Sequence, residues 1–356
     1  AVLATGARFV PLDDRRAPRP GRPPTPSAIL EALLRPPPRL AHRAAHLRGT
    51  GAVLVHDAMQ VWGGRLGLPS VAFATTALLN RHVIAESLAG REPGGDARAR
   101  RWRQLIAASP VTDLLTRLAR PLAPRGPLTI VPIPREFQPH AASFGPQYRF
   151  VGPCLAPRPA DVPLPGGLDP RRPLVLVSLG TGLNHRPQFY AACLAAFAGS
   201  RWQVVMAVGD RTRVADLGPI PDNAVVRPKV PQLHLLERAR AFVSHAGMGS
   251  VMEAAHHGVP LVLHPQMPEQ GANADRIVAH GAGIRLGRNP GAAEIRRAVE
   301  HVTTDPRIAS GTAGLRAAVR STGGAPAAAD DLQEFRSAIR LRPLPPPPED
   351  DEESYR

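Results

Sequence analysis

The sequence predicts an α/β protein made of two Rossmann-like domains, each a doubly wound parallel sheet. Apolar segments such as LVLVSLG at 174–180 and VPLVLHP at 259–265 alternate with segments of helical pattern. They are apolar at nearly every position, which is typical of strands buried on both faces of a parallel sheet. A chain of 356 residues, 43% hydrophobic and 21% charged, is long and apolar enough for two such domains.

The first half of the chain is the more irregular one. Apolar segments bounded by glycine or polar residues predict strands, and the prolines at 36–38 separate two helices. The expected elements, in chain order, are a strand at 7–12, helices at 27–34 and 40–48, strands at 51–57 and 68–76, a helix at 97–119 and a strand at 128–134.

The second half alternates more regularly between strand and helix patterns. The expected elements are strands at 174–180, 202–209, 224–227, 241–247 and 259–265, helices at 187–198, 231–239, 249–257, 272–280 and 292–303, and a last amphipathic helix at 325–341. We therefore expect an N-terminal domain at 1–153, a proline-rich linker at 154–172, a C-terminal domain at 173–324, a C-terminal helix at 325–342 and a disordered tail at 343–356.

The composition excludes several classes of protein. No apolar run approaches the roughly 18 residues that a membrane helix needs, so we expect no stable membrane insertion. The net charge is +15, but the arginines are scattered and aromatic residues make up only 4% of the chain. Because this pattern lacks a basic stripe and stacking platforms, we expect no nucleic-acid partner.

The cysteines and the first residues of the chain bear on compartment and cofactors. Cys154 and Cys193 lie far apart without CxxC spacing, and no HExxH motif is present. The sequence therefore predicts no metal or other cofactor. Two unpaired cysteines and a start without the pattern of a signal peptide favour a cytoplasmic protein.

Ligands of doubly wound sheets bind beyond the carboxyl ends of the strands, where three polar segments are expected. The first runs from Ser178 to Gly182, with two glycines and two hydroxyl groups after a buried strand. Such a segment permits a tight turn and a close approach of the backbone to an anion. The spacing of its glycines is not that of GxGxxG, the usual dinucleotide-binding motif. Taken alone, an ordinary strand-to-helix turn is the simpler interpretation of this segment.

The second segment starts at His245, where a strand ends, and its glycines lead into a helix expected to begin near Gly249 or Ser250. A helix N-terminus exposes unpaired N–H groups and a partial positive charge, which suit a diphosphate. We expect Ser250 to cap this helix and Glu253, one turn further, to accept hydrogen bonds from ribose hydroxyls. In the alternative interpretation, both residues only cap the helix.

The third segment follows the next strand and contains Glu269 and Gln270. An adjacent carboxylate and amide at the edge of a sheet can bind several hydroxyl groups of a sugar. Taken alone, this pair is more typical of a solvated loop.

Together these segments resemble the donor signature of nucleotide-sugar-dependent glycosyltransferases of the GT-B fold, especially the bacterial macrolide-type branch, which is similar to plant UDP-glycosyltransferases. The matching stretches are PLVLVSLGTG, PDNAVV, VPQ, HAGMGSVMEA and GVPLVLHPQMPEQGANA. The resemblance covers about residues 1–341 and is strongest in the C-terminal half. It implies two Rossmann-like domains facing across a cleft, with an incomplete acceptor-binding domain at 1–153 and a nucleotide-sugar-binding domain at 173–324.

The resemblance also implies a role for each matching residue of the donor site. These residues are Ser178, Gly180 and Thr181 beside the phosphates, His245, Gly247, Gly249 and Ser250 at the diphosphate, Glu253 and Gln232 at the ribose, Val230 at the nucleobase, and Glu269 and Gln270 at the sugar hydroxyls.

The chain departs from the family pattern at two places. Lys229 replaces the aromatic residue that stacks on the base, which leaves uridine and thymidine donors both open. The family's first strand, histidine loop and first helix have no full match, so we expect a fragment or a protein that has lost its base. Asp57 matches the aspartate that orients the base histidine, whereas strand alternation turns His56 to the opposite face.

These features predict an inverting glycosyltransferase that uses a UDP- or dTDP-sugar and the hydroxyl group of a small lipophilic acceptor, such as a macrolide, polyketide or phenol. Positioning and general-base catalysis would supply the rate without a metal. The alternative is a catalytically inactive nucleotide-sugar-binding protein that serves as a partner or regulator.

Overall fold

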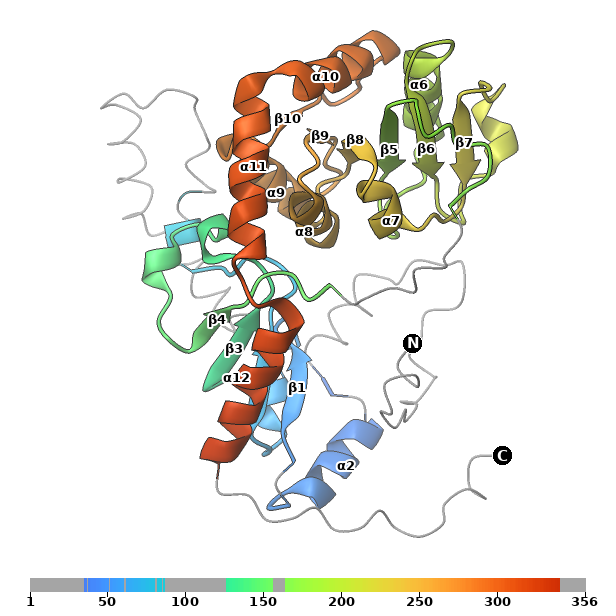
Figure 1. Cartoon of the computed structure of the whole chain (residues 1–356). Coiled ribbons are helices and arrows are strands. Elements are labelled where there is room, and N and C mark those ends of the chain that lie inside the picture. The colour runs from blue at the N-terminus through green and yellow to red at the C-terminus, as the bar shows by residue number, and fades with distance from the viewer. Residues whose placement is uncertain are drawn as a thin grey trace. The chain divides into compact units, whose positions relative to one another are not determined.

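The structure is a computed structural model that describes residues 35–86 (without 37, 51, 61, 81 and 85), 126–155 and 164–339. The strand expected at 7–12, the helices expected at 27–34 and 97–119 and the tail expected at 343–356 lie outside the described residues. The chain divides into two compact units, which are described separately (Figure 1). The first comprises Ala1–Val131, Pro139–Arg149 and Pro326–Arg356, and the second comprises Pro132–Gln138 and Phe150–Ala325.

The first unit is built on a sheet of four strands in the order β1-β2-β3-β4. β1 pairs with β2 and β2 with β3, both in parallel, as the buried apolar segments predict. These strands are β1 Leu54–Asp57, β2 Ser70–Phe73, β3 Leu128–Val131 and β4 Tyr148–Phe150. β4 was not expected, because its sequence YRF has neither an apolar run nor a clear alternation.

Helices and short 3-10 turns pack around this sheet. Helix α2 spans Pro38–Leu47 and buries Ala44 against Trp62 and Leu66. In helix α12, Gly324–Ala338, Asp331 forms an ion pair with Arg149 at 3.4 Å. The 3-10 helices are Gly63–Arg65, Arg135–Phe137, Ala141–Ser143 and Val214–Leu217, the second and the last of them in the second unit.

The second unit contains a sheet of six strands in the order β10-β9-β8-β5-β6-β7, with parallel pairing throughout. The strands are β5 Leu174–Ser178, β6 Gln203–Ala207, β7 Ala224–Arg227, β8 Ala239–Ser244, β9 Leu261–Leu263 and β10 Gly283–Arg285. From β5 the chain adds strands first on one side and then, from β8, on the other. This reversal is the topological switch point at which doubly wound sheets bind ligands.

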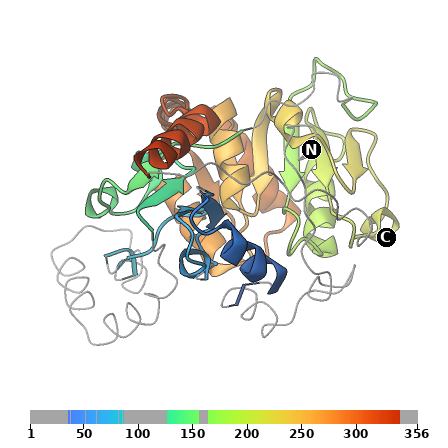
Figure 2. The ribbon, with the colours of Figure 1, turned by 90° about the horizontal axis from the view of Figure 1, so that it is seen from below.

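Helices cover both faces of this sheet (Figures 1 and 2). α6 packs against α10 on one face, and α8 packs against α9 and α11 on the other. The helices of this unit are α6 Pro187–Phe197, α7 Gln232–Leu236, α8 Met248–His257, α9 Pro268–Ala279, α10 Ala292–Thr304 and α11 Pro306–Arg320. The parallel α/β class predicted from the sequence is thereby confirmed.

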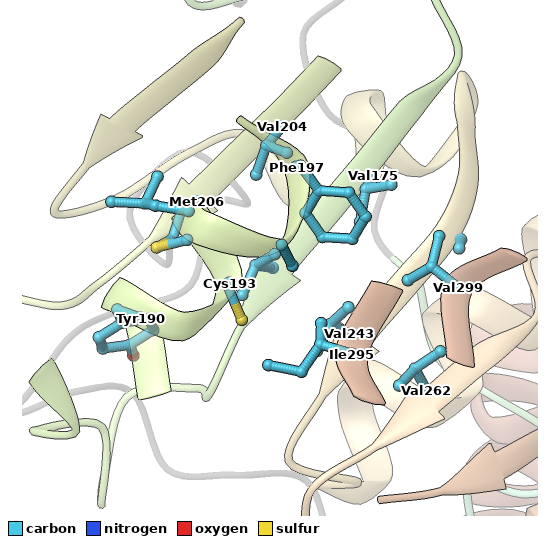
Figure 3. Close-up of a cluster of buried hydrophobic side chains, with 14 of the residues drawn as sticks. Val175, Tyr190, Cys193, Phe197, Val204, Met206, Val243, Val262, Ile295 and Val299 are labelled. Atoms are coloured by element: carbon cyan, nitrogen blue, oxygen red, sulfur yellow. The ribbon is translucent and has the colours of Figure 1, made fainter. Parts of the chain in front are cut away.

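Alternate side chains of the strands form the core beneath α6 and α10. Figure 3 shows Val175, Val204 and Val243 from three strands together with Phe197 of α6 and Val299 of α10. These side chains are fully or almost fully buried. At about 1.5–3 kcal/mol for each large apolar side chain buried, this packing is the main source of stability for the sheet that carries the candidate site.

Candidate functional site

The candidate site lies at the switch point, where β5 and β8 are neighbours. Ser178, the last residue of β5, is in register with Ser244, the last residue of β8. Their following loops therefore leave the sheet side by side, which brings the segments after Ser178 and after Ser244 together as the sequence predicts.

The turn after β8 directs the chain into helix α8. Ala246 is buried and has a left-handed backbone with φ of 65°, an uncommon conformation for a residue other than glycine. The Ser244 hydroxyl accepts a hydrogen bond from the Ala246 N–H group at 3.2 Å and supports the turn. Such strain is typical of sites where the backbone is held in place for a ligand.

Helix α8 begins one or two residues earlier than expected. Gly247 is its N-cap and Met248 its first residue, so the prediction that Ser250 caps the helix is wrong. Ser250 lies in the first turn, because the extended backbone of Gly247 already ends the strand-to-helix turn. The first N–H groups of this ten-residue helix have no acceptor within the helix and are available to an anion.

The ring of His245 lies between two glycines of the paired loops. A Cβ atom built on Gly180 would lie 2.6 Å from the ring, and one built on Gly247 would lie 2.4 Å from it. Burial lowers the pKa of His245, and a hydrogen bond to the Ser178 backbone opposes this shift. His245 is therefore neutral near pH 7 and can offer a diphosphate a hydrogen bond, not a full positive charge.

The loop after β5 is fixed by hydrogen bonds at its backbone. The buried Ser178 hydroxyl accepts from the Gly180 N–H group at 3.3 Å, and Gly180 has a φ of +75°. The side chain of Asn184 donates to the Gly180 carbonyl group at 2.8 Å. Thr181 is exposed beyond this turn. Asn184 was not expected from the sequence, since no local pattern distinguishes it from an ordinary loop amide.

Residues of α7 and α8 form a small polar cluster. The amide nitrogen of Gln232 donates to Glu253 at 2.6 Å and to Ser250 at 3.2 Å. The structure thus brings together three predicted residues that the sequence separates by up to 21 positions. Val230 lies just before α7, and Lys229 forms an exposed ion pair with Asp210 at 2.9 Å.

Glu269 and Gln270 do not lie in a loop as expected but in the first turn of α9. The helix starts at Pro268, a favourable first position because proline has no N–H group to satisfy there. Gln270 is buried, and its side-chain oxygen accepts from the Gln266 N–H group at 2.8 Å. Glu269 is exposed on the same turn.

Asn273, which joins two parts of the candidate site, was also not expected from the sequence. Its buried amide nitrogen donates to the Glu269 carboxylate at 2.7 Å and to the Ala246 carbonyl group at 3.0 Å. The spacing of four residues from Glu269 places both side chains on one helix face, which is the signal that could have found it. Asn273 thereby ties the turn before α8 to the first turn of α9.

Asp57 lies in the first unit, at the carboxyl end of β1. Its carboxylate accepts from the Met59 N–H group at 2.8 Å and from the Thr75 hydroxyl at 3.4 Å. His56 is buried, whereas Asp57 is partly exposed, in agreement with strand alternation. Its role as an orienting residue stays a prediction.

The residues that the structure describes contain no helix long and apolar enough to cross a membrane. They also contain no group of three or more histidine, cysteine, aspartate or glutamate side chains that could hold a metal ion.

The chain matches a known family and several named relatives. Residues 192–334 match the family described as Erythromycin biosynthesis protein CIII-like, C-terminal domain. NDP-glycosyltransferase YjiC of Bacillus licheniformis is 40% identical over 210 residues, which are 58% of this chain and 53% of the relative. The chain thus spans about half the length of this curated relative.

Two further similarities extend over more of the chain. The uncharacterized UDP-glucosyltransferase YojK of Bacillus subtilis is 30% identical over 281 residues, which are 77% of this chain and 69% of the relative. The crystal structure of CalG4, the calicheamicin glycosyltransferase, superimposes with a TM-score of 0.65 at 31% identity, covering 81% of this chain and 76% of that one. The chain therefore belongs to the bacterial macrolide-type family of GT-B glycosyltransferases.

Proposed function

We propose that this protein is an inverting glycosyltransferase that transfers a sugar from a UDP- or dTDP-sugar to a hydroxyl group of a small lipophilic acceptor. The observation that carries the proposal is the turn at the switch point. Its left-handed Ala246, the ring of His245 and the free N–H groups at the start of α8 converge where a diphosphate would bind. The names of the relatives favour a transferase over the catalytically inactive alternative.

In this proposal, each part of the donor meets a different element. The N-terminus of α8 and His245 bind the diphosphate, and the cluster of Gln232, Ser250 and Glu253 accepts and donates hydrogen bonds at the ribose. Glu269 and Gln270 bind hydroxyl groups of the sugar from the first turn of α9, and Val230 meets the base through its backbone.

The proposed reaction is a single displacement at the anomeric carbon. The acceptor oxygen forms the new bond to this carbon while its proton passes to the base histidine that Asp57 would orient and that has no match in this sequence. The bond from the anomeric carbon to the diphosphate oxygen breaks, and the nucleoside diphosphate leaves with the electron pair. Donors that are already fixed at the start of α8 stabilise the charge that develops on this leaving group.

Thermal unfolding with UDP or dTDP tests the donor site. We expect UDP at 100 times its Kd to stabilise the folded chain by about 2.7 kcal/mol. The variant His245→Ala should abolish the shift in melting temperature, because it removes a hydrogen-bond donor and the packing between Gly180 and Gly247. The matched control is His301→Ala, at an exposed histidine of α10. Equal shifts in the wild type and in His245→Ala would refute the donor assignment.

A further inference from the structure

Two histidines lie one turn apart on helix α2 of the first unit. His42 and His46 are separated by four residues, so their side chains project from the same side of the helix. Ala44, which lies about 160° to 200° around the helix from them, packs against Trp62 and Leu66. The two imidazole rings are therefore on the solvent side, and both histidines are exposed.

The rings of this pair converge at their outer nitrogen atoms. The two Nε2 atoms lie 3.0 Å apart, the ring centres lie 4.5 Å apart, and the ring planes form an angle of 75°. Two neutral rings in this position can share a hydrogen bond, in which one Nε2 atom donates and the other accepts. They can also both direct a lone pair at one metal ion, and histidine is the commonest metal ligand in proteins.

The separation of the two nitrogen atoms fits coordination of one metal ion. At the usual metal–imidazole distance of about 2.0–2.1 Å, atoms that are 3.0 Å apart form an angle of about 94° at the metal. Rings whose lone pairs both point to that position have their centres about 4.7 Å apart, close to the 4.5 Å of this pair. A tetrahedral zinc ion would need the Nε2 atoms about 3.3 Å apart. The pair is closer to the right angle of a tetragonal site, which Cu²⁺ and Ni²⁺ prefer.

The residues of helix α2 also indicate which metals fit. None of its ten residues is acidic, so the helix offers no carboxylate to Ca²⁺ or Mg²⁺, which prefer oxygen ligands. Two imidazole groups suit metals that accept nitrogen ligands, and among the divalent ions of this group the affinity is highest for Cu²⁺. With two protein ligands, water completes the coordination, unlike in a structural zinc site with four protein ligands.

We propose that His42 and His46 bind one divalent transition-metal ion, with Cu²⁺ preferred over Zn²⁺. The metal joins two consecutive turns of α2 and so stabilises the helix that packs against Trp62 and Leu66. A helix of ten residues is marginal in water without such support, so a link between its turns favours the folded form.

Titration with Cu²⁺ followed by electron paramagnetic resonance tests the site. The protein carries no histidine tag, and glycine buffers the free Cu²⁺ at pH 7.5, where ordinary histidines are neutral. We expect the first equivalent of Cu²⁺ to give an axial spectrum with coupling to two imidazole nitrogen atoms. In competition, Zn²⁺ should displace Cu²⁺ only when it is in large excess.

Variants separate this pair from the other histidines of the chain. His42→Gln and His46→Gln each remove one ligand at an exposed position, and each should weaken Cu²⁺ binding by about 10-fold or more, because the second ligand no longer binds intramolecularly. Arg43→His combined with His46→Ala keeps the number of histidines. Because adjacent helix residues do not face each other, this double variant should lose as much affinity. His301→Gln, at an exposed histidine of α10, should leave the affinity unchanged.

Circular dichroism establishes that each variant is folded before Cu²⁺ is added. Coupling to fewer than two nitrogen atoms, equal affinity in the wild type and in the α2 variants, or Zn²⁺ that binds as tightly as Cu²⁺ would overturn the proposal.

Discussion

Glycines on both sides of His245 set the width of the space that its ring occupies. Gly180 has a left-handed backbone, a conformation that favours glycine. The backbone of Gly247 is extended, so glycine is required there only because a side chain would not fit beside the ring. A methyl group at either position would meet the imidazole at less than van der Waals distance. The position of this ring, and with it the donor that it offers to a diphosphate, therefore depends on two residues that carry no side chain.

A pair of glycine-to-alanine substitutions tests this dependence. Gly247→Ala should displace His245 and reduce the UDP-induced rise in melting temperature by at least half, because the added Cβ would lie 2.4 Å from the ring. Gly314→Ala, in helix α11 and outside the proposed donor site, is the matched control, since nothing lies within 4 Å of the Cβ position at that glycine. Both variants are compared by thermal unfolding with and without UDP. Equal loss of UDP protection in the two variants would contradict the proposed role of the ring.

At the scale of the residue, the interactions of the candidate site residues were only partly predictable from the sequence. Ser250 and Glu253 lie on one helix as expected, but the resemblance alone placed Gln232 beside them, because no local spacing connects α7 to α8. Asn273 was missed, although its amide joins Glu269 to the Ala246 turn. A buried amide that bridges two segments has no signature in the local pattern of apolar and polar residues.

At the scale of the element, strands within continuous apolar runs were predictable, even short ones such as β9, whereas β4 and β10 were not. β5 and β8 follow runs that are apolar at almost every position. β10 has three residues, of which only Ile284 is a large apolar one, so it depends on pairing with β9 to form a strand. Helix α11 was missed because its sequence is rich in small residues, although Asp305 and Pro306 are a typical start for a helix.

The start of α11 gives a prediction for an element. The Asp305 carboxylate accepts a hydrogen bond from the Arg307 N–H group at 2.7 Å. Asp305→Ala should lower the free energy of unfolding by about 0.5–2 kcal/mol, the usual cost of removing an N-cap side chain. Urea unfolding of this variant and of Asp222→Ala, at an exposed aspartate outside any helix, measures the difference. An effect of the same size in both variants would argue against capping.

At the scale of the whole molecule, the histidines of the second unit make stability dependent on pH. Burial lowers the pKa of His245, His256, His257, His264 and His280. Below about pH 6.5 the unfolded chain therefore takes up protons that the folded chain does not. The stability contributed by these neutral rings is present above this pH and is lost as the pH falls through it.

Urea unfolding followed by circular dichroism should show this loss. The urea midpoint should fall between about pH 7.5 and pH 5.5, a window above the titration of ordinary carboxylates. The fall should be smaller in His280→Gln, which removes one of the half-buried rings. A midpoint that is constant or rises on acidification would mean that these histidines do not control stability in this range.

The parallel α/β class of the whole molecule was predictable, because continuous apolar strands alternating with helices leave few alternatives. The order of the strands in the sheet was not predictable, since local sequence patterns do not say on which side of β5 the later strands pair. The reversal between β5 and β8 emerges only from the fold. It is this reversal that brings Gly180 and Gly247 against the same histidine ring.

The central claim is that the N-terminus of α8 binds the diphosphate of a nucleotide sugar. A crystal structure of the chain with UDP is the most direct measurement. We expect diphosphate oxygens within about 3 Å of backbone N–H groups at Gly247–Ser250, with the ring of His245 in contact. A diphosphate bound elsewhere, with the start of α8 closed by neighbouring side chains, would contradict the account.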